Sequence, residues 1–308
     1  MDVRACLSTV SALLDQGAAD SAVRMLRNAW EPELPPEHRA PLYCMWVRGL
    51  CDGGDLDHAR VLAERAADEF PTHADVLNAL GNVLDLQGET RLALAVFERA
   101  RDADPDNPLA HFNLGAMLER VDRPAQARES YERACALAQA SGAPSLEATL
   151  ALGALLRRQD RLQAAVATYE TYLESDPTSV EVLVEHGICL SVLEEFDLAC
   201  ERFELALAVE PTDTGALYNL AVTRFRMGEL DEAISTMERA DASQPRAPLT
   251  WAMLGSWVSW SSCWPSPGSI RAGSSCASIR PWWARITPWR ACAGPTTPCG
   301  STPSTRAS

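Results

Sequence analysis

Apolar residues along most of the chain recur every three or four positions, as they do on one face of an α-helix. One such stripe runs from Val76 to Leu84 and ends at Gln87-Gly88, and a second runs from Leu92 to Ala100 and ends at Asp104-Pro105. Because Gly and Pro interrupt helices, each break marks a helix end. The pattern therefore predicts two amphipathic helices joined by a short turn.

This pattern returns every 34 residues, which three columns of residue types show independently. One column is alanine: Ala59, Ala93, Ala127, Ala165, Ala199 and Ala233. A second consists of small residues: Gly81, Gly115, Gly153, Gly187, Ala221 and Gly255. A third is proline: Pro71, Pro105, Pro177, Pro211 and Pro245. All three columns share one four-residue insertion near Ser141–Pro144, so a true internal repeat is indicated.

Each column has a steric explanation. We expect the small residue of the first helix, such as Gly81, and the alanine of the second, such as Ala93, where the two helix backbones approach most closely. The later alanine, such as Ala100, leaves room for the first helix of the next unit. Proline cannot continue a helix, so Pro105 ends the second helix and turns the chain.

The spacing of these residues resembles the tetratricopeptide repeat (TPR), a 34-residue unit with Leu-Gly, Ala, an aromatic residue, Ala and Pro at fixed positions. The resemblance covers seven units: 3–36, 40–73, 74–107, 108–141, 146–179, 180–213 and 214–247. Units 3–36 and 40–73 match less well; in the latter, Val47 stands for the usual Gly and Ala63 for the aromatic residue. The resemblance implies an all-α fold, a right-handed superhelical solenoid of helix-turn-helix units.

Composition narrows the class of protein further. The formal net charge is −15, and residues 1–241 hold all 42 acidic residues and 21 of the 27 basic ones, a net charge of −21. Because such a body repels phosphate backbones, we expect no nucleic-acid partner. No apolar run reaches the roughly 18 to 20 residues of a membrane-spanning helix. The N-terminus lacks the pattern of a secretory signal, so we expect no membrane insertion and a cytoplasmic location.

No residue pattern typical of catalysis, metal binding or cofactor binding is present. The ten cysteines form no C-x-x-C pair, and the five histidines have no metal-binding spacing. His111 and His186 fall at core positions of first helices, where a hydrogen-bonded structural histidine is the simpler interpretation. Asp52–Asp57 resembles a calcium loop but lacks its downstream Glu. We therefore expect no enzyme activity, no metal and no cofactor.

The TPR resemblance implies a binding surface instead. In the family, side chains at positions 2, 5, 6, 9, 12 and 13 of each unit face a concave groove lined by the first helices. Amides there pair with an extended peptide backbone, and aromatic rings anchor apolar side chains. The candidate groove residues in this chain are Asp75, Asn78, Asn82, Asp85, Phe112, Asn113, Glu119, Glu147, Arg157, Arg158, Glu181, Glu185, Tyr218, Asn219, Phe225 and Arg226. Each is also compatible with a merely solvated or packing role.

Two functions remain open. The first is a non-catalytic scaffold that binds a protein or peptide segment, basic or neutral, in the groove. The second is the TPR arm of a larger enzyme, such as a transferase, whose catalytic domain is lost by frameshift or truncation. A secreted or periplasmic assembly factor would require an upstream start that encodes a signal peptide.

The repeat pattern stops within the eighth unit. Residues 248–255 begin that unit on schedule, but residues 242–308 hold seven of the nine Trp and nine of the twenty Pro, without one acidic residue. Read two bases along with GC-rich codons, Ser256–Trp264 gives Leu-Gly-Glu-Leu-Glu-Gln-Leu-Leu, a plausible turn and second TPR helix. Residues 256–308 are therefore interpreted as an out-of-frame translation, the alternative being a genuine disordered Trp-, Pro- and Ser-rich tail.

This interpretation makes a prediction at the level of the gene. Resequencing through codon 255 should reveal a frame in which the 34-residue pattern continues past Gly255. An unchanged frame, together with a compact protease-resistant domain formed by residues 256–308, would contradict it.

Overall fold

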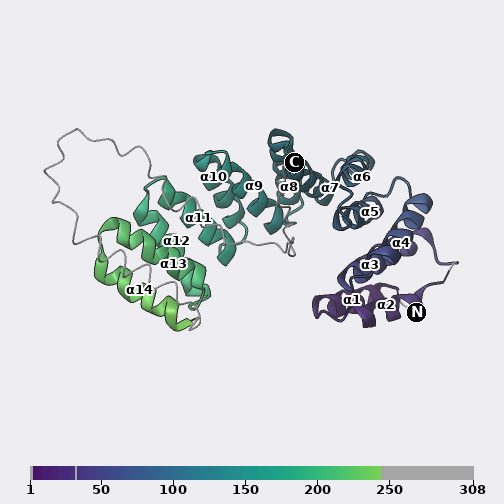
Figure 1. Ribbon diagram of the computed structural model, residues 1–308, viewed down its shortest axis with the longest axis horizontal. Helices are drawn as coiled ribbons and strands as arrows, with labels where there is room; N and C mark the ends of the chain where they lie inside the picture. Colours follow the sequence, from purple (N-terminus) through teal and green to yellow (C-terminus); the bar gives the residue numbers. More distant parts are fainter. Residues whose placement is uncertain (1–2, 32, 244–308) are drawn as a thin grey trace, which may run out of the picture. The chain divides into compact units, whose positions relative to one another are not determined.

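The computed structural model describes residues 3–31 and 33–243 (Figure 1), and within these ranges the chain forms fourteen α-helices and no strand. They follow one another as seven hairpins. The first helices of the hairpins are α1 (Val3–Asp15), α3 (Pro36–Asp52), α5 (Ala74–Leu86), α7 (Pro108–Arg120), α9 (Leu146–Arg158), α11 (Val180–Val192) and α13 (Thr214–Met227). The second helices are α2 (Ala19–Ala29), α4 (Leu56–Glu69), α6 (Thr90–Ala103), α8 (Pro124–Ala140), α10 (Leu162–Leu173), α12 (Phe196–Val209) and α14 (Leu230–Ser243).

The predicted all-α repeat solenoid is confirmed. Every first helix except α3 begins at the first residue of its 34-residue unit, whereas α3 begins at Pro36, four residues before position 40. Pro36 is well suited to a helix start, because its fixed φ matches the helix and its missing N–H needs no partner there. Residues 248–255 and the proposed out-of-frame segment 256–308 lie outside the described residues.

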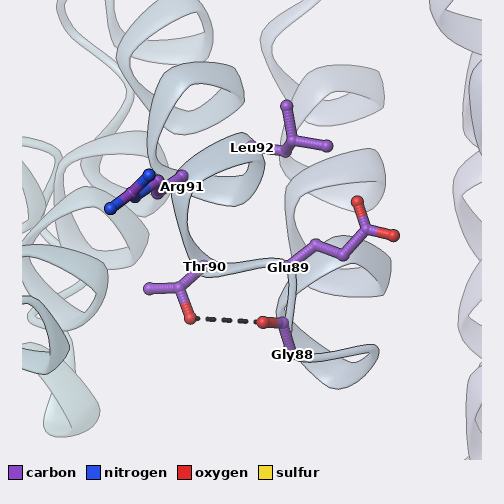
Figure 2. A pocket seen from close by; sticks show the side chains of 5 residues that line it. All are labelled: Gly88, Glu89, Thr90, Arg91 and Leu92. Atoms are coloured by element: carbon purple, nitrogen blue, oxygen red, sulfur yellow. Dashed lines mark hydrogen bonds between the residues drawn. The ribbon is translucent and has the colours of Figure 1, made fainter.

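The turn that ends each first helix places one residue in the left-handed region. In the turn between α5 and α6 this residue is Gly88, at φ +79° (Figure 2). The Glu89 N–H donates to the Leu84 carbonyl at 2.8 Å. The same turn position in later hairpins holds Asp122, Asp160 and Glu194, all at positive φ. Side chains other than Gly are strained there, so hairpin geometry rather than local preference imposes this conformation.

Within each hairpin, an aromatic ring of the second helix fills the space above a glycine of the first. A Cβ atom built on Gly81 would lie 2.5 Å from the Phe97 ring, and one built on Gly187 would lie 2.6 Å from the Phe203 ring. Gly115 with Tyr131 and Gly153 with Tyr169 repeat this arrangement. The glycine column is therefore explained by the ring sixteen residues later, and not by close approach of the two helix backbones as the sequence suggested.

In units that lack the glycine or the aromatic ring, other residues fill the same space between the two helices. The residues at the two positions, again sixteen apart and buried, are Val47 and Ala63 in the second unit and Ala221 and Met237 in the seventh. A larger residue on the first helix thus accompanies a smaller one on the second. The apparent departure at Val47 is a complementary exchange rather than a loss of the packing.

Packing between hairpins distinguishes the two sets of helices. Each helix packs on the next one in sequence, and first helices also contact one another in the pairs α1–α3, α3–α5, α5–α7, α9–α11 and α11–α13. Second helices approach one another less closely, so the first helices lie on the inner side of the stack. The pair α7–α9 is also less close, since α8 is extended to 17 residues by the insertion.

The ring-over-glycine contact predicts a specific pattern of stability changes. Gly187→Val should overpack the hairpin by about 1–3 kcal/mol, and Phe203→Ala should leave a cavity that costs about 3–5 kcal/mol. Because the double variant reproduces the Val47–Ala63 combination, its loss should be smaller than the sum by about 1 kcal/mol or more. Urea unfolding followed by circular dichroism measures all three. Strict additivity would show that the two positions do not share one space.

Candidate interaction surface

Ion pairs join the first helices of neighbouring hairpins near their C-terminal ends. In each case an arginine reaches back to a carboxylate on the preceding first helix. The pairs are Arg48 with Asp15, Arg120 with Asp85, and Arg158 with Glu119. Successive first helices therefore present these side chains on a common face, which we call the inner face.

The same end of the helices holds two further contacts. The Arg157 Nη2 atom lies 3.3 Å from Glu185 Oε2, which links α9 forward to α11. Arg226 Nη1 donates to the Ser191 carbonyl at 2.6 Å, and its Nη2 lies 3.7 Å from a Glu194 carboxylate oxygen. Six of the predicted groove residues are thus engaged within the array itself: Asp85, Glu119, Arg157, Arg158, Glu185 and Arg226. Partly exposed pairs of this kind contribute about 1 kcal/mol or less each.

The N-terminal ends of the first helices differ. Asp75, Glu147 and Glu181 are exposed at position 2 of their units and form no ion pair within the part of the chain that the structure describes. Their hydrogen-bond donors are neutral: Asn107 Nδ2 for Asp75 at 3.2 Å, and Ser145 Oγ for Glu147 at 3.2 Å. A carboxylate in the first helical turn is favoured by the helix dipole, so these charges are stable there without a basic partner.

Position 2 lies on the same face as position 13. The two are eleven residues apart, which is close to three turns of α-helix, so Glu147 and Arg158 lie one above the other along α9. The inner face thus carries internally neutralised ion pairs at one edge and uncompensated carboxylates at the other.

The asparagine side chains predicted for the groove differ in exposure and in hydrogen bonding. Asn82 is exposed on α5, as expected for a groove residue. Asn78 is only 2% exposed, and neither of its amide atoms has a hydrogen-bond partner among the described residues. Asn113 is half-buried with an unpartnered Nδ2 atom, and Asn219 Nδ2 donates to the Gly215 carbonyl at 2.8 Å.

The three predicted aromatic anchors are all half-buried. The Phe112 ring lies 5.9 Å from the Tyr131 ring, between centroids, and therefore belongs partly to the core. Burial raises the pKa of the Tyr218 hydroxyl above its usual value, and Phe225 is likewise half-buried on α13. Only part of each of these side chains is therefore accessible to a partner.

Two residues of the inner face were missed from the sequence. Arg120 at position 13 is the partner of Asp85. Leu109 occupies position 2 of its unit, is 49% exposed, and lies one turn before Phe112 on α7. Position number alone could have identified both, because each stands at a position that the family resemblance assigns to the groove.

Negative charge is concentrated away from the helices of the inner face. The seven first helices together contain nine acidic and eight basic residues, whereas the turns between helices contain fifteen acidic residues and two arginines. The turns that lead into the first helices hold eight of those acids and no base. Two of those acids, Glu174 and Asp176, lie in the turn before Glu181, whereas the turns before Asp75 and Glu147 hold none, so the added negative charge at this edge lies beside Glu181.

His186 is buried within the array, as its core position predicts, but it is not hydrogen-bonded as expected. It is 1% exposed, and both ring nitrogens lack a hydrogen-bond partner among the described residues. Burial, assisted by the positive charge of Arg202, lowers the pKa of His186 to about 4. The Glu170 carboxylate lies 3.9 Å from its Nε2 atom but is largely exposed, so solvent screens its opposing effect. His111, by contrast, has Nε2 2.9 Å from the Pro105 carbonyl.

The described residues offer no group of three or more His, Cys, Asp or Glu arranged to hold a metal ion. Desolvation raises the pKa of the Cys44 and Cys189 thiols to about 12, which leaves them protonated and unreactive. Asp55, from the run that resembled a calcium loop, instead accepts a hydrogen bond from the His58 N–H at the start of α4.

Two open depressions on the described surface are lined by residues of single inter-helix turns or of two neighbouring turns. The one drawn in Figure 2 is open and lined by a single turn, Gly88 to Leu92, without a catalytic combination of side chains. No helix among residues 3–31 and 33–243 has the length and apolar character needed to cross a membrane. The inner face is therefore the principal candidate surface.

Seven stacked helical hairpins in the described part of the chain, whose first helices line one face, define a helical-repeat protein. The chain belongs to the tetratricopeptide repeat family: family models described as tetratricopeptide repeat match residues 52–118 and 193–256, and residues 107–177. Repeats of this family are typical of protein–protein interaction scaffolds. The last match ends at residue 256, next to Gly255, where the repeat pattern stops.

Individual relatives share only part of their sequence with this chain. The chain is 26% identical over 231 residues to a BBSome complex member BBS4 homolog of Drosophila melanogaster, covering 71% of this chain and 47% of that protein. It is 35% identical over 91 residues to a probable UDP-N-acetylglucosamine–peptide N-acetylglucosaminyltransferase SPINDLY of Solanum lycopersicum, covering 30% of this chain and 10% of that protein. The chain thus spans less than half the length of these relatives.

A solved structure supports the fold alone. The crystal structure of PilW, a type IV pilus biogenesis factor, has a TM-score of 0.59 and 18% sequence identity, covering 70% of this chain and 98% of that chain.

The environment of His186 predicts a dependence of stability on pH. The unfolded chain takes up the histidine proton near pH 6.5, whereas the folded chain takes it up only near pH 4. The unfolding free energy should therefore decrease as the pH falls through this window, by at most about 1.4 kcal/mol per pH unit. Urea unfolding between these pH values measures the slope.

The variant His186→Gln should lack this component of the slope. His38→Gln is the matched control, because His38 is exposed at the start of α3 and its removal leaves the buried surroundings of His186 intact. Equal slopes for both variants would contradict the assignment.

Proposed function

We propose that this chain is a non-catalytic scaffold that binds an extended segment of a partner protein on the inner face formed by its first helices. The observation that carries the proposal is the set of uncompensated carboxylates at the N-terminal edge of that face, which favours a basic or neutral segment. An extended peptide also finds amide side chains there, such as Asn82, that can pair with its backbone.

The charge distribution supports a polypeptide over a nucleic-acid partner. The turns beside the inner face are acidic, and a phosphate backbone would be repelled from them. The arginines of the face are engaged with carboxylates of neighbouring hairpins, which reduces their capacity to hold phosphate.

A cytoplasmic location forms part of the proposal. The six cysteines within the described ranges are all free, which is compatible with a reducing compartment: Cys6, Cys44, Cys51, Cys135, Cys189 and Cys200. Membrane insertion is not part of the proposed function.

A second candidate is the TPR arm of a larger enzyme. It is favoured by the match to the SPINDLY protein, whose name describes a glycosyltransferase and of which this chain covers 10%. The two candidates differ in the coding sequence after codon 255. Further TPR units there would favour the scaffold, and a catalytic domain would favour the enzyme arm.

Peptide selection tests the scaffold proposal. A random twelve-residue library, selected against the full chain, should yield peptides richer in Lys and Arg than in Asp and Glu. Their affinity should fall as salt is raised from roughly 50 to 300 mM, because the Debye length shortens to a few ångströms. Fluorescence anisotropy at the two ionic strengths measures this effect.

A matched pair of variants locates the binding surface. Asn82→Arg adds a positive charge to the inner face and should weaken binding of the selected basic peptides. Thr171→Arg adds the same charge to the exposed side of α10 and should have little effect. Enrichment of acidic peptides, binding unaffected by salt, or equal effects of the two substitutions would refute the proposal.

A further inference from the structure

Four residues at position 2 form a row across consecutive first helices. In order along the array they are Asp75 on α5, Leu109 on α7, Glu147 on α9 and Glu181 on α11. All four are exposed. We call them the position-2 row; the inference below rests on the proposed function and specifies the partner.

The row contains three negative charges without basic partners and one apolar side chain. Within the described ranges, no arginine or histidine forms an ion pair with Asp75, Glu147 or Glu181. The two glutamates act on one common site: both help to raise the pKa of Tyr172, after the larger effects of burial and of Asp176. A partner with basic groups is therefore attracted to this part of the row.

The apolar member is held in a fixed place. Asn107 Oδ1 accepts hydrogen bonds from the Leu109 and Ala110 N–H groups at 3.0 and 3.2 Å, and Pro108 fixes the first turn of α7. Phe112, one turn after the exposed Leu109 on α7, is half-buried, so part of its ring is also accessible. Together they provide a place for one apolar side chain, with acidic positions on the helices to both sides.

A second observation at the same place indicates a missing partner. Asn78 lies one turn after Asp75 on α5, is nine-tenths or more buried, and has no hydrogen-bond partner for either amide atom among the described residues. A buried amide without partners is costly. A peptide backbone bound beside Asp75 would supply the missing donor and acceptor if the Asn78 side chain turned toward it.

The spacing of the row matches an extended chain. Packed helices lie about 8–10 Å apart, and an extended peptide advances about 3.3 Å per residue. A partner that crosses the first helices therefore meets one row residue about every three of its own residues. The step from α7 to α9 is wider, because these two helices approach each other less closely than α5–α7 or α9–α11.

We propose that the position-2 row recognises an extended partner segment with four key residues, spaced about three residues apart. In order along the row, these are one basic residue, one apolar residue and two basic residues. The basic side chains pair with Asp75, Glu147 and Glu181, and the apolar one packs on Leu109. A second copy of this chain is a poor occupant of the row, since its own inner edge carries the same negative charge.

Synthetic peptides test the spacing with the full chain. The probe is a twelve-residue Gly/Ser peptide with Arg, Leu, Arg and Arg at its positions 2, 5, 8 and 11. A second peptide has the reversed sequence. A third has an interval of four residues, instead of three, between the Leu and the next Arg, to match the wider step from α7 to α9. The comparison peptide has the same composition with these four residues adjacent. The best spaced peptide should bind at least about fivefold more tightly than the clustered one in fluorescence anisotropy.

Charge-neutral variants test the contacts. Glu147→Gln with Glu181→Gln should weaken binding of the spaced peptide about fivefold, as expected for two exposed ion pairs. Glu129→Gln with Asp197→Asn removes the same charge from exposed positions on α8 and α12 and should change the affinity less than twofold. Leu109→Ser should weaken the Leu-containing peptide but not a version with Ser in place of Leu.

The outcomes separate this inference from the proposed function. Equal binding of spaced and clustered peptides, or equal effects of the row and control variants, overturns the inference while library-selected ligands still bind the inner face. Failure of every peptide, with no ligand selected from the library, overturns the proposed function as well.

Discussion

The packing of one ring against one small residue, sixteen positions earlier, is the contact on which the array depends. Where the first helix has Gly187, the second has Phe203; where it has Val47, the second has Ala63. Interiors packed to crystal density tolerate neither a void nor an overlap, so the two positions vary together. This local fit sets the approach of the two helices in each hairpin, and stacking of like hairpins then aligns their first helices on one face.

Because the fold is specified by these internal positions, the inner face is free to carry function. Its two edges differ in net charge. At the C-terminal edge, arginines and carboxylates of neighbouring hairpins neutralise one another, as Arg158 does with Glu119. At the N-terminal edge, Glu147 and Glu181 have only neutral hydrogen-bond donors, and the turn before Glu181 adds the negative charges of Glu174 and Asp176. An acidic edge beside a neutralised one favours a partner whose basic groups lie along one side.

The fifth and sixth hairpins, which carry Glu147 and Glu181, each depart from the repeat at particular positions. Tyr172 stands where other second helices have alanine, and α10 ends at Leu173, earlier in its unit than α12 does. His186 is held neutral in the adjoining core without a hydrogen bond. Glu194, in the turn after α11, has a left-handed conformation that favours glycine. These local departures persist because the neighbouring hairpins on both sides constrain the backbone.

The sequence by itself determined the helices, their pairing into hairpins and the face on which each residue lies. Those features depend on spacing within 34 residues, which the 3.6-residue helical period converts directly into geometry. Only the tertiary structure decided which of the candidate residues remain available. Asp85 meets Arg120 thirty-five residues away, Asn78 is enclosed while Asn82 is not, and Gly81 accommodates the Phe97 ring rather than a helix backbone. These outcomes depend on the distance and rotation between packed helices, which side-chain volumes determine and a residue pattern does not record.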